Sequence, residues 1–314
     1  MSKDLNIQNN SLYNNRLVRR FCQLYSKPQL SSITESSSTT TTKPTRAKKD
    51  HLLICYAVAG YPDIKTTKEI VSAMIRSGAD IIEIGLPFSD PIADGPIIQE
   101  ASFISLTHGI TPNKGLEIVK DIRKEFSKIP IVVMTYSNIL VKAGLRKFMR
   151  KARQSGVDGF IIPDMPIEES DEYVKEASKL NLATIFLVTP NTNQKRLRSI
   201  ASRSSGFLYL VSVYGITGIR KSFDEYTATY IKNTKRILRS SVPLAVGFGI
   251  SNPSHAKFMI RAGADAIIVA SAIINIIESY VNRRDNNNKN KEEMLKAVRT
   301  FVSNIKKSCI QINS

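Results

Sequence analysis

The amino-acid sequence predicts an α/β protein in which eight parallel strands close into a (β/α)8 TIM barrel, with a disordered N-terminal leader and a C-terminal helical extension. Three observations predict this class. Eight short apolar runs recur along the chain, amphipathic segments lie between them, and a glycine–acid motif marks three of the junctions. The chain has 314 residues, which is enough for a barrel domain of about 250 residues.

The strands are predicted from runs that are apolar throughout rather than alternating. Strands of a parallel sheet are covered on both faces and therefore have this pattern. The eight runs are Leu52–Val58, Ile81–Gly85, Ile131–Met134, Gly159–Ile162, Thr184–Val188, Phe207–Val211, Pro243–Val246 and Ala266–Ala270.

Helices are predicted where apolar residues recur three and four positions apart. Parallel strands need such crossover helices, and eight strand–helix units can close into a barrel. An open doubly wound sheet stays as the alternative, because strand count alone does not prove closure. The clearest helical segments are Ile64–Arg76, Lys114–Phe126, Leu145–Gln154 and Glu168–Leu180, with a further one over Lys291–Ile310.

The recurring motif reads Ser77-Gly-Ala-Asp80, Ser155-Gly-Val-Asp158 and Ala262-Gly-Ala-Asp265. Each copy lies between a predicted helix and a predicted strand. Glycine there suits the left-handed residue that ends a helix.

Charge and composition divide the chain into three parts: a basic low-complexity leader or insert (residues 1–50), the barrel (51–282), and a C-terminal linker and helix (283–314). Lys and Arg number 45 against 27 Asp and Glu, for a net charge of +18. Residues 1–50 hold nine basic and three acidic residues, and residues 276–314 hold eight and four. More than half of the excess therefore lies at the two ends. No basic run is interleaved with aromatic residues, so nucleic-acid binding is not expected.

The first fifty residues are rich in Ser, Thr and Asn, with an unbroken hydroxyl run over Ser36–Thr42. Such composition buries too little apolar surface to fold, so we expect disorder there, apart from a short helix over Leu17–Tyr25. This composition fits either a transit segment that is cleaved off or a solvated insert that is retained. The leader points to a plastid (chloroplast) stroma, with a bacterial-type cytoplasm as the alternative.

Several classes are excluded or disfavoured. No apolar stretch approaches the length that a membrane helix needs, so no membrane association is expected. Cys22, Cys55 and Cys309 are far apart and odd in number, which argues against disulfides or a metal site and for a reducing compartment. His51, His108 and His255 are predicted to be structural or solvent-facing.

Glu83 is the first candidate for chemistry. It lies near the end of the second predicted strand, between Ile82 and Ile84, and barrel active sites lie at the C-terminal ends of the strands. Burial would raise the pKa of its carboxyl group toward neutrality, where it could give and take protons. The alternative is a structural glutamate paired across the barrel.

The loop after that strand supplies a second candidate. It carries Ser89, Asp90 and Asp94, and Asp94 could face the same cavity as Glu83. Asp and Pro also suit plain turns, so neither aspartate is compelling by itself.

Three later segments could form a phosphate site. They are Gly215-Ile-Thr-Gly218, Gly247-Phe-Gly249 and Ala270-Ser271, each at the end of a predicted strand. Glycine lets backbone N–H groups approach an anion, and a helix start adds a favourable dipole. Tyr209 in the sixth strand faces either the barrel mouth or the core.

These segments carry a family resemblance. The stretch Ile82-Glu-Ile-Gly-Leu-Pro-Phe-Ser-Asp-Pro-Ile-Ala-Asp-Gly-Pro96 closely resembles the signature of the tryptophan synthase α subunit. Further matches occur in family order and cover about residues 50–282: Ala59-Gly-Tyr-Pro62, Met134-Thr-Tyr-Ser-Asn138, Pro163-Asp-Met-Pro166, Tyr209-Leu-Val-Ser212 with Gly215-Ile-Thr-Gly218, and Gly247-Phe-Gly-Ile250.

The resemblance implies a lyase that cleaves indole-3-glycerol phosphate to indole and D-glyceraldehyde 3-phosphate in a retro-aldol reaction, without metal or cofactor. It implies that Glu83 is the general acid/base and that Asp94 binds the indole N–H. The remaining implied substrate contacts are Tyr56, Tyr209 and Phe248 for the indole, and Gly218, Gly249, Ala270 and Ser271 for the phosphate.

The resemblance also implies an α2β2 assembly with a β subunit that receives the indole and makes L-tryptophan. Its implied docking positions are Pro87, Asp90, Asn138 and Pro166. A standalone lyase without a β partner, and a non-catalytic barrel that serves as a binding partner, remain the alternatives.

Three features depart from the family pattern. The connection over residues 28–50 is longer, the C-terminal part beyond Tyr280 is longer and more basic, and Ala270 stands where the family commonly has glycine. The phosphate loop must then accept a Cβ atom or a negative φ at Ala270.

Overall fold

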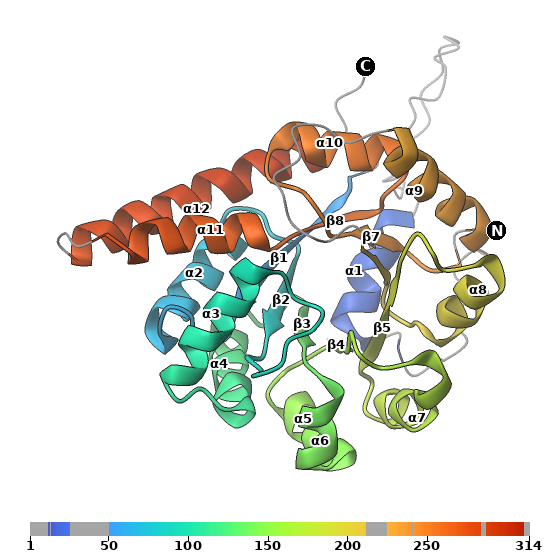
Figure 1. Cartoon of the computed structure of the whole chain (residues 1–314), viewed down its shortest axis with the longest axis horizontal. Helices are drawn as coiled ribbons and strands as arrows, with labels where there is room; N and C mark the ends of the chain where they lie inside the picture. Colours follow the sequence, from blue (N-terminus) through green and yellow to red (C-terminus); the bar gives the residue numbers. More distant parts are fainter. Residues whose placement is uncertain are drawn as a thin grey trace, which may run out of the picture.

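The computed structural model describes residue 12 and residues 14–25, 50–211, 225–239, 241–283 and 287–310. Eight strands pair in parallel in chain order, and the eighth pairs with the first, so the barrel is closed (Figure 1). The predicted TIM barrel is confirmed, and the open sheet is excluded. The strands are β1 (Leu52–Val58), β2 (Ile81–Gly85), β3 (Ile131–Met134), β4 (Gly159–Ile161), β5 (Ala183–Val188), β6 (Leu208–Leu210), β7 (Leu244–Val246) and β8 (Ala266–Val269).

Helices surround the barrel and connect successive strands. They are α1 (Arg16–Tyr25), α2 (Ile64–Arg76), α3 (Pro96–Thr107), α4 (Pro112–Glu125), α5 (Ser137–Ala143), α6 (Leu145–Gln154), the 3₁₀ turn η2 (Ile167–Glu169), α7 (Asp171–Lys179), α8 (Gln194–Arg203), α9 (Glu225–Leu238), α10 (Pro253–Ala262), α11 (Ser271–Val281) and α12 (Asn287–Cys309). The helix predicted over 168–180 is divided at Ser170, whose hydroxyl donates to the Ile167 carbonyl 2.7 Å away.

Apolar side chains fill the barrel on both sides of the sheet. The interior is filled from alternate strand positions such as Leu52, Ile54, Ile81 and Val132. The intervening positions, including Ile82 and Ile84, pack outward against the helices. This double coverage explains why the strands are apolar throughout.

The recurring glycine–acid motif forms a set of clamps at the N-terminal floor of the barrel. Its glycines take positive φ, between 93° and 114°. Its aspartates accept the backbone N–H of the preceding strand: Asp80 from Leu53 at 2.7 Å, Asp158 from Ile131 at 2.9 Å and Asp265 from Leu244 at 2.8 Å. The aspartates therefore hold β1, β3 and β7 in register with the strands that follow them.

Helix α1 closes this floor. Its Leu17 and Phe21 are buried in the interior cluster, and the Phe21 ring lies 5.6 Å from the Phe207 ring, centroid to centroid. A helix thus forms where a short one was predicted, and it packs as part of the barrel. The physical reason is that the open end of the ring would otherwise expose apolar side chains.

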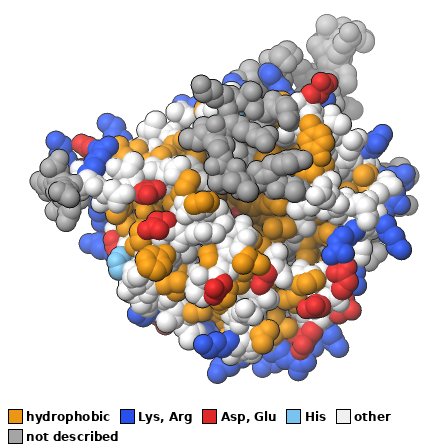
Figure 2. Space-filling model, in the orientation of Figure 1, with side chains coloured by type: hydrophobic (Ala, Val, Ile, Leu, Met, Phe, Trp, Pro, Cys, Tyr) orange, Lys and Arg blue, Asp and Glu red, His pale blue; other side chains and the backbone are white. Residues whose placement is uncertain are grey.

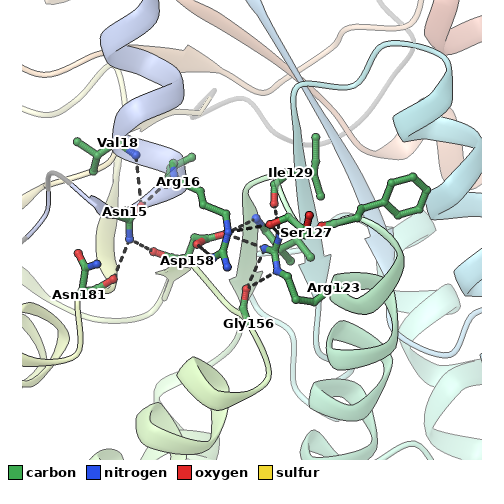
Figure 3. A network of polar contacts seen from close by, with 12 residues as sticks. Asn15, Arg16, Val18, Arg123, Ser127, Ile129, Gly156, Asp158 and Asn181 are labelled. Atoms are coloured by element: carbon green, nitrogen blue, oxygen red, sulfur yellow. Dashed lines mark hydrogen bonds and ion pairs between the residues drawn. The ribbon is translucent and has the colours of Figure 1, made fainter.

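Polar contacts fix α1 to two of the clamps, and Figure 3 shows the clamp of Asp158. Asn15 caps the helix by accepting from the N–H of Leu17 at 2.9 Å, and its amide donates to the Asp158 carbonyl at 2.7 Å. Asp158, which is fully buried, also pairs with Arg16 at 2.6 Å and with Arg123 at 2.8 Å. Arg20 pairs with Asp80 at 2.5 Å.

Helix α12 packs against the barrel rather than projecting alone. It lies beside α11 (Figure 1) and contacts α10, α2 and β1 as well. Its Met294, Val298, Val302 and Ile305 are buried. Within the described ranges, none of the helices has the length and apolar character required to span a bilayer.

The Asp158 clamp provides a test of how the floor is held. Asp158→Asn keeps the shape of the side chain but leaves Arg16 and Arg123 without their buried anion, so we expect the free energy of unfolding to fall by about 3 kcal/mol. Asp121→Asn removes the exposed ion pairs with Lys68 and Lys124 and should cost no more than about 1 kcal/mol. Urea unfolding of both variants measures the difference, and equal losses would contradict the role of the buried clamp.

Candidate active site

Glu83 points into the barrel near its C-terminal end. It follows Ile81 by two positions on β2, on the same face, and pairs in register with Tyr56 of β1 and Val132 of β3. The side chain is fully buried, and neither carboxyl oxygen has a hydrogen-bond partner among the described residues. Burial, followed by the charge of Asp94, raises the pKa of Glu83 to about 8. At neutral pH the carboxyl group therefore carries its proton.

Asp94 lies in the loop between β2 and α3. The loop is held by a bond from the Asp94 N–H to the Pro91 carbonyl, 2.9 Å, and by one from the Gln99 side chain to the Asp94 carbonyl, 2.8 Å. Burial raises the pKa of Asp94 to about 6, against the opposing effect of a hydrogen bond from Tyr136. Asp94 is therefore ionised at neutral pH, whereas Glu83 is protonated.

Two tyrosine hydroxyl groups lie close enough to Glu83 and Asp94 for the carboxylate charges to change their pKa values. Tyr56 and Tyr209 are both buried. Burial raises the pKa of each hydroxyl, and the charges of Asp94 and Glu83 raise it further. The structure thus brings Glu83, Asp94, Tyr56 and Tyr209 together in the barrel mouth.

Glycines on neighbouring strands make room for the tyrosine rings. A Cβ atom at Gly85 would lie 2.0 Å from the Tyr56 hydroxyl oxygen, and one at Gly247 would lie 2.5 Å from the ring of Tyr209. Sequence reasoning did not assign Gly85 a role, although its position at a strand end next to Glu83 was a usable signal.

The segments after β7 and β8 end at the same rim. Gly249 is exposed and takes φ of 66°, and its carbonyl is bonded to the His255 ring at 2.9 Å. Ala270 has the negative φ expected of a non-glycine residue, −122°, and its side chain makes no capping bond to α11, which begins at Ser271. Phe248 is half-buried. Gly218 lies outside the described residues.

The predicted docking positions differ in exposure. Asp90, Asn138 and Pro166 are exposed, whereas Pro87 is buried. The side chain of Pro87 is covered because the backbone has not yet left the sheet: the N–H of Leu86 still bonds the Met134 carbonyl at 2.9 Å. The docking role of Pro87 stays a prediction that rests on the resemblance.

The view in Figure 2 shows apolar side chains around a hollow near the middle of this face, with Lys and Arg mostly along its outer edge. The described residues contain no cluster of His, Cys, Asp and Glu that could hold a metal ion. A closed α/β barrel with one protonated and one ionised carboxyl group in its mouth defines a class: an enzyme equipped for acid–base chemistry on a substrate that enters from the rim.

Comparison with known proteins narrows the class. The family model of the tryptophan synthase alpha chain matches residues 43–309, so the chain belongs to that family and is a lyase of tryptophan biosynthesis that cleaves indole-3-glycerol phosphate. The match includes α12, so this helix lies within the part of the chain that the family shares.

Individual relatives agree over most of their length. The tryptophan synthase alpha chain of Methanoregula boonei is 42% identical over 258 residues, 82% of this chain and 94% of the relative. That of Carboxydothermus hydrogenoformans is 40% identical over 261 residues, 83% and 95% of the two chains.

Solved structures share the fold. A structure of the α2β2 tryptophan synthase complex of Pyrococcus furiosus, described as giving the basis of mutual activation, superposes with a TM-score of 0.74 at 37% identity over 82% of this chain and 98% of the other. The alpha subunit of Legionella pneumophila superposes with a TM-score of 0.75 at 30% identity over 94% and 98%.

The buried Glu83 predicts a pH-dependent stability. Its pKa is about 8 in the folded chain against 4.5 for an ordinary glutamate, so the folded state binds the extra proton and loses stability as pH rises between these values. Relative to Glu83→Gln, we expect the free energy of unfolding of the unmodified chain to fall by up to about 4 kcal/mol from pH 5 to pH 8.5. The free energy of unfolding of both proteins is measured in urea at each pH. If the two values changed with pH in parallel, the burial of an unpaired carboxyl group would be contradicted.

Proposed function

We propose that Glu83 is the general acid/base of the retro-aldol cleavage and that Asp94 is the carboxylate that binds the indole N–H. The observation that carries the proposal is the contrast between two neighbouring groups. Glu83 has no hydrogen-bond partner among the residues that the structure describes and a pKa of about 8, whereas Asp94 has a pKa of about 6. One is therefore a proton donor and the other an anion at the same pH.

The reaction follows from these two states. Glu83 gives its proton to C3 of the indole, and the positive charge that develops on the ring is stabilised through the N–H by Asp94. The bond from C3 to the glycerol carbon then breaks, and its electron pair restores the aromatic ring. The hydroxyl on that glycerol carbon returns a proton to Glu83 and becomes the aldehyde. Glu83 ends protonated, as it began.

The remaining roles concern substrate binding. Tyr56, Tyr209 and Phe248 are proposed to flank the indole, since Tyr56 and Tyr209 lie near the two carboxyl groups and Phe248 follows β7. For the phosphate we propose Gly249, Ala270 and Ser271, supported by the start of α11 at Ser271, since the N-terminus of a helix favours an anion. Gly218 joins them on the resemblance alone.

We further propose that the chain assembles with a β subunit as α2β2 and docks it on three loops: the loop of Pro87 and Asp90, the loop of Asn138, and the loop of Pro166. The support is the assembly of the Pyrococcus furiosus relative and the apolar surface beside these loops. Ile92 is 81% exposed and Val141 77% exposed, and exposed apolar side chains of this kind are typical of interfaces.

The domain division that we propose has a catalytic barrel over residues 51–282, a leader or insert over 1–50, and a linker and helix over 283–314. The plastid stroma is likewise a proposal, and it rests on the composition of the leader alone. The relatives named above are archaeal and bacterial, and they lend it no support.

Exchange of either carboxylate tests the proposed reaction. Glu83→Gln removes the proton donor and Asp94→Asn removes the anion, so kcat/KM for indole release should fall by at least about 100-fold in each. The loss in kcat/KM is measured by following indole release from indole-3-glycerol phosphate, with and without a β subunit. Phosphate-dependent binding of the substrate should persist in both variants. Turnover of Glu83→Gln near that of the unmodified chain would refute the assignment.

The leader has its own test. The packing of Phe21 and the Arg16–Asp158 pair favour retention of α1, because cleavage at residue 50 would uncover the barrel floor. We expect the intact mass of the mature chain from its source to include residues 14–25. A mature chain that starts near residue 50 would support a transit segment and contradict the retained helix.

A further inference from the structure

Tyr136 lies between the last residue of β3 and the first residues of α5, and it touches Asp94. Its hydroxyl donates to Oδ2 of Asp94 at 2.9 Å and accepts from the N–H of Ala93 at 3.3 Å. The ring is 2% exposed and stacks on Phe88, with 5.1 Å between the centroids. The buried side chain of Tyr136 therefore contacts the loop of Asp94 at three residues: Phe88, Ala93 and Asp94.

The next residue extends this contact to a third loop. The N–H of Ser137 donates to Asp164 at 2.9 Å, and its hydroxyl donates to the same carboxylate at 2.6 Å. Asp164 thus caps α5 from the loop after β4, where Tyr136 at the N-cap position provides no cap of its own. Asp94 with Tyr136 and Ser137 with Asp164 form two hydrogen-bonded pairs, which the peptide bond between Tyr136 and Ser137 joins. We call these four residues the rim chain.

The rim chain runs directly under the proposed docking positions. Asp90 precedes Asp94 by four residues, Asn138 follows Ser137 at once, and Pro166 follows Asp164 by two. These three positions are exposed, whereas Tyr136 is buried. A partner that binds the three loops would therefore press on the rim chain from outside the barrel.

We propose that Tyr136 is a positioning residue for Asp94, and that the rim chain couples docking of the β subunit to the placement of that carboxylate in the barrel mouth. The inference rests on the proposed function, and it assigns this chain a route for mutual activation of the kind described for the Pyrococcus furiosus complex. Coupling by such a route requires that docking favours one placement of Asp94 over another.

Tyr136→Phe tests the positioning half in the chain without its partner. The ring and its stacking on Phe88 remain, while the bond that stabilises ionised Asp94 is lost. The acid limb of the pH profile of kcat/KM should move up by about one pH unit. Tyr173→Phe is the matched control, because its buried hydroxyl donates to the Phe160 carbonyl at 3.1 Å, away from the site. It should leave the limb in place.

Carbon-13 NMR titration of the Asp94 carboxyl group follows the same change without turnover. A shifted titration in a chain that cleaves no substrate would sustain the positioning role while the proposed function fails. An unshifted limb and an unshifted titration in folded Tyr136→Phe would overturn the proposal.

Ser137→Ala tests the coupling half at saturating β subunit, so that a change in docking affinity has no effect on the rate. It removes one bond of the rim chain, and we expect the stimulation of indole release by the β subunit to fall at least about five-fold. Asp164→Asn should act in the same direction. Ser170→Ala is the control, because its hydroxyl bonds only within its own turn. Unchanged stimulation in both rim-chain variants, or no stimulation of the unmodified chain, would overturn the coupling.

Discussion

The chemistry depends on one constraint: a carboxyl group that is held dry inside a closed ring of strands. Glu83 is fully buried and has no hydrogen-bond partner within the part of the chain that the structure describes. An ionised carboxylate in that position would be costly, so the proton stays bound at neutral pH. Asp94 is also raised in pKa, but its bond from Tyr136 opposes the rise. A single hydrogen bond thus helps to separate the proton donor from the anion.

The dry interior in turn depends on the opposite end of the barrel. Strand ends leave backbone N–H groups that need acceptors, and Asp80, Asp158 and Asp265 provide them. Before β6, Ser205 does the same for the N–H of Thr184 at 2.9 Å. Helix α1 then covers the floor with Phe21 and neutralises two of the clamps through Arg16 and Arg20. The two ends are physically linked, because water that entered below would reach the layers of side chains under Glu83.

Much of this could be predicted from the amino-acid sequence, and the misses have clear causes. Apolar runs gave the strand positions within a residue or so, since burial on both faces leaves a local signature. The burial of Pro87 could not be predicted, because its exposure depends on how far β2 stays paired with β3. Tyr136 lay inside a quoted motif without a role, because its bond to Asp94 joins residues 42 positions apart. In the sequence, the aspartates of the glycine–acid motif were recognised only as residues that follow helix ends. Their bonds to the preceding strand form only when the folded chain places the strands side by side.

The sequence by itself determined the architecture and the chemical groups: eight doubly covered strands, the order of strand and helix, a carboxylate at the end of the second strand, and the family. These are properties of local pattern, which the order of residues carries directly. Tertiary structure alone decided which groups meet. Closure of the ring removed water from Glu83, placed Tyr56 and Tyr209 near it, and brought three loops into contact through the rim chain. Desolvation and long-range contact belong to the folded arrangement, and no short stretch of sequence encodes them.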